Sequence, residues 1–544
     1  MNKIFVNQVG FLPGSRKQAV LSFPADDFKV VESDGTLALE GKTVHFGTDD
    51  ISGEDVYVAD FSALDKEGAY RLVAGDAESA NFFVGENAFD KLKKDTCKSF
   101  YFLRCGDALD KKYAGDYYHE PCHMSKATVY GEDTEPVDVC GGWHDAGDYG
   151  RYSTAGAVAV AHLLYAARFF TDLLNLEFDI PKEKCDKGNY PDILSEVKVE
   201  LDFLMKMQRP DGSVWHKVTT FNHTGFIMPE EDKDELFLFS VSSMATADIA
   251  AVFALAYSVY KDYDKAYAKK LLEKSLAAYK WLKDNPGELL FKNVEGSNTG
   301  EYGEAEDISN RYWAACALYE ATSEGGYYQD ALDHRHRLAE FDKKSPMKGY
   351  HGDVFTRLGW AEVAGLGGFS LLLKNEDNTL SIATRESFVS EAKRLVANAK
   401  KNGFNLCMES KDFIWGSNME LLKYMMIITV ANRIAPEEEF ANAITSGLDY
   451  LLGCNSMDVS YVTGNGEKAF KNPHLRPTAA DNIEEPWPGL VSGGPNTGLQ
   501  DERARTLPKD LPAMKCYLDH VDCYSLNEIT IYWNSPLVFV LSAL

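Results

Sequence analysis

Residues 141–149 read Gly-Gly-Trp-His-Asp-Ala-Gly-Asp-Tyr, which places Asp145 and Asp148 three residues apart in a glycine-rich turn. Nearly four hundred residues later, Glu528 stands where an apolar run begins. Hydrolysis of an acetal needs one carboxyl group to protonate the leaving oxygen and a second one to activate water or to attack carbon. The two segments therefore predict a hydrolytic site if the fold brings them together.

Each of these acidic residues also has a purely structural interpretation. Asp145 can cap a following helix, and Asp148 can accept a hydrogen bond from the backbone of a turn. Glu528 can lie in the first turn of the last helix, where the helix dipole favours acidic residues. Taken separately, the three carboxyl groups do not decide between catalysis and local structure.

The first 86 residues have the pattern of a small β-sandwich. Short apolar or alternating runs are separated by turn residues such as Pro13-Gly14, and several short strands at close spacing are typical of an antiparallel sandwich. From residue 87 onward, apolar residues recur at three- and four-residue spacing, which predicts about twelve helices. Their expected starts lie near Ala88, Thr154, Ile193, Ser242, Lys265, Ser309, Tyr327, Val354, Ile382, Asn418, Pro436 and Asn527.

Long loops interrupt these helices at residues 111–153, 209–241, 286–308 and 453–526, and loops of this length are usually functional. Twelve helices make six hairpins, and a closed double ring of helices buries both faces of each pair. Periodicity alone does not separate this ring from a helical solenoid. We expect a mainly α protein, with a small β-sandwich over residues 1–86 and an (α/α)6 barrel over residues 87–544.

The composition limits the class of partner. The chain has 83 acidic and 56 basic side chains and a formal net charge of −27. This charge argues against nucleic acid and against an anionic membrane surface, whereas a neutral ligand is compatible with it. No run of eighteen apolar residues occurs, so we expect no membrane span. We expect a monomer.

The start of the chain, residues 1–10, lacks the apolar stretch of a signal peptide and has the pattern of a strand. We therefore expect a cytoplasmic protein, or a secreted one if a leader has been removed.

The loop before the last helix contains the run Asn472-Pro473-His474-Leu475-Arg476-Pro477. His474 and Arg476 lie on one side of a short extended segment, where they can donate hydrogen bonds to the hydroxyl groups of a ligand. The alternative is that Arg476 pairs with an aspartate and locks the loop to the core.

Taken together, these segments resemble glycoside hydrolase family 9, the inverting β-1,4-glucanases that include many cellulases. The runs 460–476 and 517–535 resemble the two active-site signatures of the family, and residues 143–148 resemble its aspartate motif. The N-terminal segment, with Asn7-Gln8-Val9-Gly10-Phe11, resembles the immunoglobulin-like module of one branch. The resemblance covers essentially the whole chain, with the motifs in the order of the family.

The resemblance implies a role for each carboxyl group. Asp148 would be the general base that activates water, Asp145 would help to hold this water, and Glu528 would be the general acid. An inverting enzyme must leave room for water between its carboxyl groups, roughly 6.5–9.5 Å, so acid and base are expected on different elements.

Other side chains are implied as contacts of the sugar. His474, Arg476 and Tyr524 match family positions that contact the sugar around the cleaved bond. His216, in Val214-Trp215-His216-Lys217, and Trp415, in Trp415-Gly416-Ser417-Asn418, are further candidates for such contacts.

A second constellation consists of Cys105, Cys122, His123 and His144. Two cysteines and two histidines suit tetrahedral zinc, but their spacing is not that of a standard zinc finger, so the residues alone favour unpaired thiols. The resemblance favours structural zinc, because the branch with the immunoglobulin-like module looks to hold zinc at these positions. Such a zinc would fix the backbone that presents both aspartates.

Calcium is left open. Where many relatives carry Asp-Glu as calcium ligands, this chain has Ser309-Asn310. Four nearby acidic residues can still supply oxygen ligands to a hard cation: Glu304, Glu306, Asp307 and Asp353.

We therefore expect an inverting hydrolase that acts on cellulose-type β-glucans or cellodextrins. One alternative is an exo-acting glycosidase of the same fold, such as a β-glucosaminidase. A second alternative is a non-catalytic carbohydrate-binding protein, which would require a missing carboxyl group, and none of the three is missing.

Overall fold

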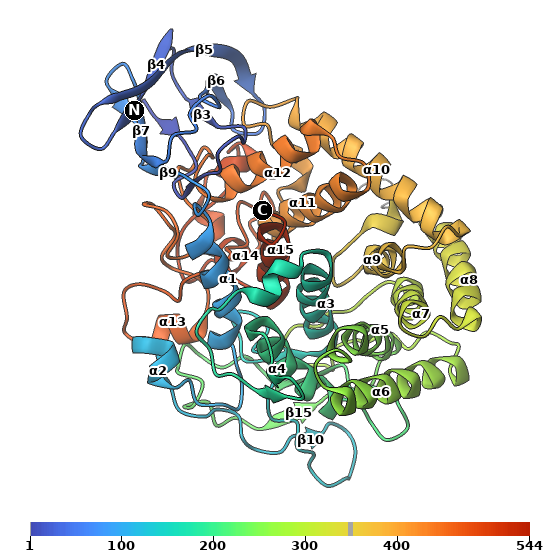
Figure 1. The fold of residues 1–544 in the computed structure, drawn as a ribbon. Coiled ribbons are helices and arrows are strands. Elements are labelled where there is room, and N and C mark those ends of the chain that lie inside the picture. Colours follow the sequence, from blue (N-terminus) through green and yellow to red (C-terminus); the bar gives the residue numbers. More distant parts are fainter. Residues whose placement is uncertain (1, 346–351) are drawn as a thin grey trace. The chain divides into compact units, whose positions relative to one another are not determined.

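The computed structural model describes residues 2–345 and 352–544 and divides into two compact units. The first unit contains residues 1–99, 392–529 and 544, and the second unit contains residues 100–391 and 530–543. Each unit is therefore built from segments that are far apart in the sequence, as the colours of Figure 1 show.

The N-terminal part of the first unit is a nine-stranded sheet in the order β1-β3-β6-β5-β4-β7-β9-β2, with β8 paired to β7. Its strands are β1 (Ile4–Phe5), β2 (Gly10–Phe11), β3 (Gln18–Leu21), β4 (Asp27–Glu32), β5 (Leu37–Asp49), β6 (Glu54–Asp60), β7 (Gly68–Ala74), β8 (Ala77–Glu78) and β9 (Phe82–Val84). β5 is 13 residues long and pairs with β4 and with β6, and a register shift in each ladder bends the sheet around a core.

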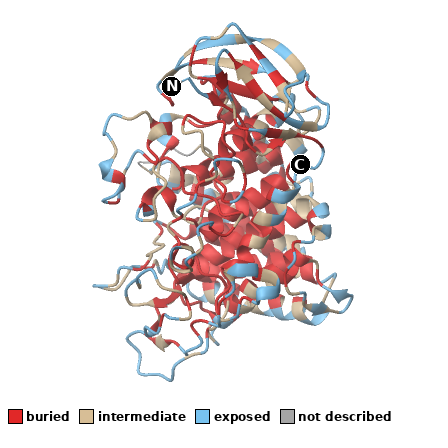
Figure 2. Cartoon of the chain, turned by 90° about the vertical axis from the view of Figure 1, so that its left-hand side faces the viewer, coloured by how far each residue is buried: buried red, intermediate tan, exposed pale blue. Residues whose placement is uncertain are grey.

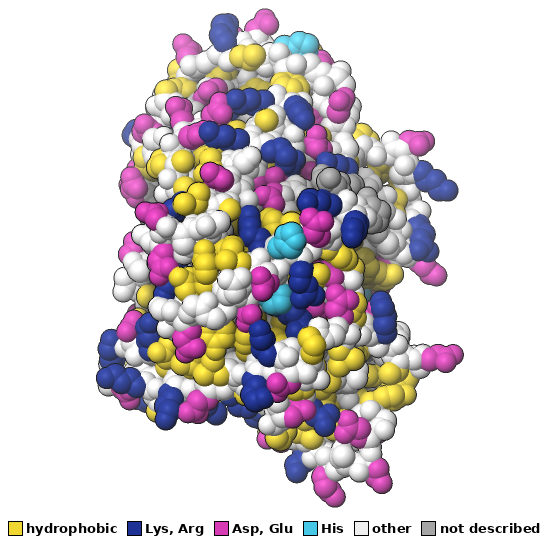
Figure 3. All heavy atoms as spheres, turned by 90° about the vertical axis from the view of Figure 1, so that its right-hand side faces the viewer, with side chains coloured by type: hydrophobic (Ala, Val, Ile, Leu, Met, Phe, Trp, Pro, Cys, Tyr) yellow, Lys and Arg dark blue, Asp and Glu magenta, His cyan; other side chains and the backbone are white. Residues whose placement is uncertain are grey.

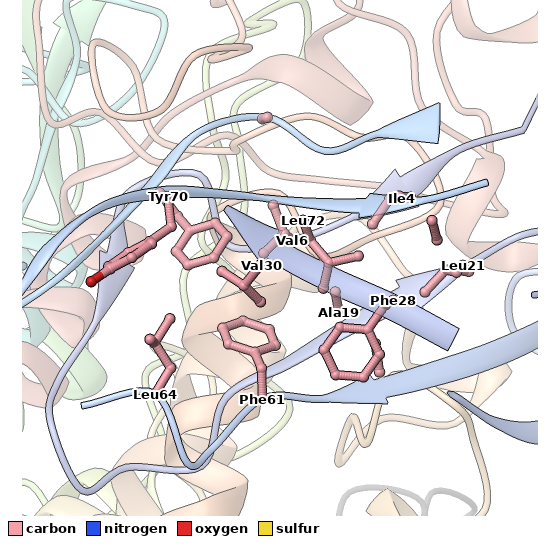
Figure 4. Close-up of a cluster of buried hydrophobic side chains, with 14 of the residues drawn as sticks. Ile4, Val6, Ala19, Leu21, Phe28, Val30, Phe61, Leu64, Tyr70 and Leu72 are labelled. Carbon is pink, nitrogen blue, oxygen red and sulfur yellow. The ribbon is translucent and has the colours of Figure 1, made fainter. Parts of the chain in front are cut away.

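The core of this sandwich confirms the prediction of a β-rich N-terminal segment. Inward-facing side chains of the strands and of the 61–64 turn meet in one cluster (Figure 4). The labelled members are Ile4, Val6, Ala19, Leu21, Phe28, Val30, Phe61, Leu64, Tyr70 and Leu72. Alternation of buried and exposed residues along β4 and β7 is the two-residue period that predicted these strands.

The sandwich is bonded to the helical part of the first unit. Asn7 donates a hydrogen bond of 2.9 Å to Asp449, and both side chains are buried. The backbone of Gly403 donates to the Asp49 carboxylate at 2.8 Å, and the backbone of Lys468 donates to the side chain of Gln8 at 2.7 Å. Unpaired polar groups at these buried positions would be costly, so the bonds fix the sandwich on the helices.

Two helices of the first unit, α11 (Ser417–Ile434) and α12 (Glu438–Leu451), pack against each other. Short helices α13 (Arg476–Ala480) and α14 (Tyr524–Asn527) follow in the long C-terminal segment. The helices α1 (Asp90–Phe102) and α10 (Thr379–Ala399) each pass from one unit into the other.

The second unit is built on five helices that contact one another in succession: α15 (Ile531–Leu541), α3 (Ser153–Phe169), α5 (Ser243–Tyr260), α7 (Ile308–Thr322) and α9 (Ala364–Lys374). Helices α4 (Asp192–Lys206), α6 (Lys265–Asp284) and α8 (Gly325–Asp342) pack against α3, α5 and α7, respectively. α2 (Lys111–Ala114) is a single turn.

Burial separates these two sets of helices. α3, α5 and α15 are buried on almost every side, whereas α6 and α8 keep one exposed face. Figure 2 draws buried residues in red and exposed residues in pale blue. α5 is long and apolar enough to cross a membrane by length and composition alone, but its residues are buried inside the unit. A helix that is apolar all round is typical of a protein core. Acidic and basic side chains are intermixed on the face drawn in Figure 3.

The second unit also contains a four-stranded sheet that the sequence analysis placed in loops. Its order is β10 (Thr128–Val129), β15 (Leu236–Leu238), β14 (Lys217–Thr220) and β11 (Arg151–Tyr152). β12 (Lys184–Cys185) and β13 (Gly188–Asn189) form a separate hairpin. Strands of two to four residues are too short to show a period, which is why the segments 111–153 and 209–241 resembled loops.

Two expected helix starts are wrong. Val354–Thr356 is a single 3-10 turn that Asp353 caps, and α9 begins only at Ala364. The last helix begins at Ile531 instead of Asn527, because the hydroxyl of Thr530 caps it by accepting a hydrogen bond from the backbone of Trp533. The other expected helices begin within three residues of their predicted starts.

Candidate active site and metal centre

Asp145 and Asp148 lie in an irregular segment of the second unit, just before β11 and α3. Their exposed fractions are 1% and 7%. The backbone of Asp145 donates to Gly150 at 3.0 Å and accepts a hydrogen bond from Ile531 at 2.8 Å. Asp145 does not cap the following helix. The N-cap residue of α3 is Tyr152, and no side chain caps this end of the helix with a hydrogen bond. The segment is thus anchored at the starts of two core helices.

A tyrosine hydroxyl donates to each aspartate. Tyr152 donates to Oδ2 of Asp148 at 3.0 Å, and the backbone of Gly150 donates to the same oxygen at 3.0 Å. Tyr302 donates to Oδ2 of Asp145 at 2.5 Å. A Cβ atom at position 150 would lie 2.6 Å from Asp148 Oδ2 and from the hydroxyl of Tyr152, so this position requires glycine. The turn bond expected for Asp148 is therefore present, together with a tyrosine that the sequence analysis missed.

Burial raises the pKa of Tyr152 and Tyr302 well above the ordinary value, and the adjacent aspartates raise it further. Both hydroxyls therefore stay protonated and act as donors at neutral pH. A hydrogen-bond donor stabilises the ionised form of a carboxyl group, which is the form that a general base requires.

The backbone before the aspartates rests on α4. The backbone of Trp143 donates to Glu200 at 2.7 Å, and the indole nitrogen of Trp143 donates to Glu196 at 2.9 Å. Gly142 has a φ of +79°, and a Cβ atom there would lie 2.6 Å from the ring of Phe203, so only glycine fits. Burial raises the pKa of Glu200 to about 8.

The four residues of the second constellation meet in the second unit. One ligand atom from each of Cys105, Cys122, His123 and His144 lies within 4.8 Å of the others, and all four residues are buried. Backbone bonds from Cys105 to Gly142 and from His144 to Leu103 pair the two segments that carry Cys105 and His144. Ligand atoms around a tetrahedral zinc ion are roughly 3.3–3.9 Å apart, so this set can close on one metal ion with a small contraction.

The surroundings of this cluster suit a metal ion. Asp232 lies 3.4 Å from Nε2 of His123, as an outer carboxylate that can orient a ligand. Burial alone would raise the pKa of the Cys105 thiol, but a hydrogen bond from Cys122 and the charge of Arg151 lower it well below the ordinary value. His144 directly precedes Asp145, so a metal bound here would hold the backbone of the aspartate segment.

Glu528 lies in the first unit, in an environment unlike that of the aspartates. It follows α14 in an extended conformation and is half-buried, so it is not a first-turn residue of the last helix as one alternative proposed. Its carbonyl oxygen accepts a hydrogen bond from Gly493 at 2.9 Å. The backbone of His474 donates to Asn527 at 2.9 Å, and His474 and Glu528 are paired in an isolated parallel β-bridge.

Three of the candidate sugar contacts gather in the first unit. The ring of Tyr524 lies 5.3 Å from the ring of Trp415 and 5.9 Å from that of His474, measured between centroids. Trp415 is 42% exposed and Tyr524 is 37% exposed, which leaves apolar ring faces open to a ligand. Arg476 is buried at the first position of α13. A cavity of about 600 Å³ opens beside Tyr524.

His216 is placed differently from the expectation. It has no exposed surface, stacks on Phe291 with ring centroids 4.0 Å apart, and bonds Ser242 through Nδ1 and the carbonyl of Glu301 through Nε2. Burial lowers its pKa to about 3, so the ring is neutral at pH 7. Because the carbonyl oxygen of Glu301 can only accept, Nε2 is the nitrogen that carries the proton. A direct sugar contact by His216 is therefore ruled out by its burial, and the residue holds the segment around Glu301 instead.

The acidic residues considered for calcium do not converge on a cation. Asp307 pairs with Arg311 at 2.9 Å, Glu306 accepts backbone bonds from Ile308 and Ser309, and Asp353 caps a 3-10 turn. Glu304 faces the buried Asp248, but the amide nitrogen of Asn310 lies between them, 3.3 Å and 2.9 Å away. In this orientation the Asn310 amide presents an N–H donor, which is not a calcium ligand, between the two carboxyl groups.

The catalytic part of the chain matches a known family. Glycosyl hydrolase family 9 matches residues 89–541, and the cellulase N-terminal ig-like domain matches residues 1–79. The chain belongs to glycosyl hydrolase family 9. It is therefore a glycoside hydrolase with an immunoglobulin-like N-terminal domain, as the sequence analysis predicted, and the segments 143–148, 460–476 and 517–535 all lie within the matched residues.

Several relatives are similar over nearly their whole length. A cellodextrinase of Butyrivibrio fibrisolvens is 71% identical over 545 residues, with all of both chains covered. Endoglucanase D of Acetivibrio thermocellus is 35% identical, with 99% of this chain and 83% of the relative covered. A solved structure of AaCel9A in complex with cellobiose-like isofagomine has a TM-score of 0.91 at 34% identity, with 99% of both chains covered. A Zn-binding triple mutant of the family 9 endoglucanase J30 has a TM-score of 0.90 at 31% identity, with 98% and 99% covered.

Proposed function

We propose that this enzyme hydrolyses β-1,4-glucosidic bonds in soluble cellodextrins, with inversion at the anomeric carbon. Asp148 acts as the general base, Asp145 helps to hold the attacking water, and Glu528 acts as the general acid. The cellodextrinase that is 71% identical over the full length of both chains supports the substrate class.

The observation that carries the proposal is the pair of buried aspartates, each of which accepts a hydrogen bond from a tyrosine. Two donors to one oxygen of Asp148 favour its ionised form, so it can take a proton from water. Glu528, which is half-buried, then has to deliver a proton to the leaving oxygen. The reaction requires roughly 6.5–9.5 Å between acid and base, because water must fit between base and sugar.

The proposal includes a platform for the sugar and a detailed architecture. His474 and Arg476 would donate to sugar hydroxyls, and the exposed rings of Tyr524 and Trp415 would stack on sugar faces. We also propose that residues 87–544 close into an (α/α)6 barrel, which an immunoglobulin-like module at residues 1–86 precedes in the chain, and that the enzyme is a monomer. The succession of contacts from α15 through α3, α5 and α7 to α9 supports this barrel.

Product analysis on three substrates tests the activity. We expect cellohexaose to be cleaved to short cellodextrins, phosphoric-acid-swollen cellulose to be cleaved more slowly, and chitosan oligomers to be left intact. Cleavage of chitosan oligomers in preference to cellohexaose would favour a glucosaminidase instead. NMR of fresh products tests the stereochemistry: an initial α-anomer supports inversion, and an initial β-anomer would mean that one aspartate is a nucleophile.

We further propose that the metal held by Cys105, Cys122, His123 and His144 is zinc and that it is structural. Two thiolates and two imidazoles are the donor set that zinc prefers, and four protein ligands leave no position for substrate. The chemistry that zinc supplies here is charge neutralisation and cross-linking, which hold the aspartate segment. Elemental analysis should find one zinc per chain, and Cys122→Ser should lose zinc and lower the Tm. Protein that holds no stoichiometric zinc after purification without chelators would refute the proposal.

A further inference from the structure

Two consecutive residues, His216 and Lys217, lie at the start of β14, outside the segments that resemble the family motifs, and bind one short segment of the second unit. Lys217 has no exposed surface, and its ammonium group donates to Asn293 at 2.6 Å, to Thr299 at 2.9 Å and to the carbonyl of Gly300 at 2.7 Å. His216 bonds the carbonyl of Glu301 at 2.9 Å. The segment 299–301 is thus held by two buried side chains.

The same segment delivers a hydrogen bond toward each aspartate. The backbone of Gly300 donates to the hydroxyl of Tyr152 at 3.1 Å, and this hydroxyl donates to Asp148. The next residue but one, Tyr302, donates to Asp145 and has a left-handed φ of +47°, a conformation that a tyrosine rarely adopts unless its surroundings impose it. The position of both donors therefore depends on how the segment 299–302 is held.

Lys217 is also a cross-strand neighbour of Tyr152, the residue that donates to the proposed base Asp148. Lys217 is paired with Tyr152 in the ladder between β14 and β11, and its ammonium nitrogen lies 5.7 Å from the ring of Tyr152 and 4.7 Å from the ring of Phe239. The charged groups that act on it are Asp148 and Glu301. Burial lowers the pKa of Lys217 to about 7, and these two carboxylates oppose that change.

We infer that Lys217 is a positioning residue for both aspartates: its ammonium group fixes the segment 299–302, which aims Tyr152 at Asp148 and Tyr302 at Asp145. His216 supports the same segment from its other side. The inference rests on the proposed function for its kinetic readout, because it assigns Asp148 as the base, but the geometry that it predicts does not depend on the substrate.

The kinetic test is Lys217→Met, which keeps an apolar stem of similar length and removes the ammonium group. We expect kcat on cellotetraose to fall about 10- to 100-fold with KM changed by no more than about threefold, because misplaced donors disturb the base and not the sugar contacts. The acid limb of the pH profile of kcat/KM should move to higher pH, because loss of a nearby positive charge raises the pKa of Asp148. His223, whose Nδ1 lies 3.6 Å from Asp148, stays in place as a second basic group.

Lys292→Met is the matched control. Lys292 also pairs with Glu301, at 3.1 Å, but its side chain is 73% exposed. We expect it to keep the kcat and the acid limb of the wild type. A folded Lys217→Met variant with a wild-type kcat, or with an unmoved acid limb, would overturn the inference. If Lys217 had only a structural role, the variant would have a lower Tm but an unchanged kcat and an unchanged acid limb.

Thr299→Val decides the case in which Lys217→Met does not fold. It removes one acceptor of the ammonium group and keeps the charge, so kcat should fall about threefold or more while the acid limb stays. A wild-type kcat in this variant would overturn the inference. If the wild-type enzyme cleaves no cellodextrin, the proposed function fails, but the positioning can still be tested by a crystal structure of Lys217→Met, or of Thr299→Val if Lys217→Met does not fold. In that structure Gly300 should have moved out of hydrogen-bonding distance of Tyr152. An unmoved segment 299–302 would refute the inference.

Discussion

The two regions that carry the catalytic carboxyl groups are held by different means. Asp145 and Asp148 are buried, and tyrosine hydroxyls donate directly to their carboxylates. Glu528 is half-buried. Its segment is fixed by main-chain bonds from Gly493 to Glu528 and from His474 to Asn527, and by the side chain of Asn527, which donates to Asp519 at 3.0 Å. Donors aimed at a carboxylate favour its ionised form, so the first arrangement suits a base, whereas the bonds around Glu528 hold the backbone from which the proposed acid projects.

The most direct way to break this comparison is to remove the base. Asp148→Asn keeps an oxygen that can accept from Tyr152 and Gly150, so the segment should stay folded. We expect kcat to fall about 10²–10⁴-fold, the usual contribution of general base catalysis. The loss should be equally large for cellotetraose and for an aryl cellobioside, because water must be activated whatever the leaving group is. Turnover close to that of the wild type would remove Asp148 from this role.

Glu528→Gln separates the acid from the base. Cellotetraose releases a sugar alkoxide that needs a proton, so we expect a loss of about 10²–10⁴-fold in kcat on this substrate. With 2,4-dinitrophenyl β-cellobioside, whose leaving group needs no proton, the loss should be at least tenfold smaller. Equal losses on both substrates would contradict the assignment of Glu528 as the acid. Circular dichroism of both variants checks that each is folded.

One tyrosine in the aspartate region, Tyr302, and one in the Glu528 region, Tyr524, allow a further comparison. Tyr302→Phe removes the donor to Asp145, and a hydrogen bond to a charged group contributes about 1.5–3 kcal/mol, so kcat should fall about 10- to 100-fold. Tyr524→Phe, in the region of Glu528, keeps the exposed ring that we propose to contact the sugar, and its kcat and KM should change by less than about threefold. A larger effect in Tyr524→Phe than in Tyr302→Phe would mean that hydroxyl donors matter more on the acid side.

What the sequence could predict follows from how local each signal is. The aspartate segment and the Glu528 segment are continuous motifs, so the sequence identified them and the family. The donors were missed because Tyr302 is 157 residues from Asp145 along the chain and no pattern connects the two. His216 was predicted to contact the sugar because the sequence reveals that a side chain can donate hydrogen bonds but does not reveal whether it is buried. The fold prediction failed in the same way where strands of two to four residues were too short to show a period.

Asp449 tests the physical basis of the comparison at a buried carboxyl group outside the site, and it should have no effect on turnover. Burial raises its pKa to about 7, although Asn7 donates to it at 2.9 Å. Because the pKa in the unfolded chain is about 3.9, the neutral form is favoured in the folded state, and stability is lost as the pH rises from about 4 to about 7. Asp449→Asn keeps an acceptor for Asn7 and removes the charge. The variant should therefore be more stable than the wild type at pH 8, by no more than about 4 kcal/mol, and equal to it near pH 4. Urea unfolding at both pH values measures this difference in stability. A variant that is less stable than the wild type at pH 8 would show that the ionised carboxylate is stabilised at the junction with the N-terminal sandwich. One amide donor would then be enough to keep a buried aspartate charged.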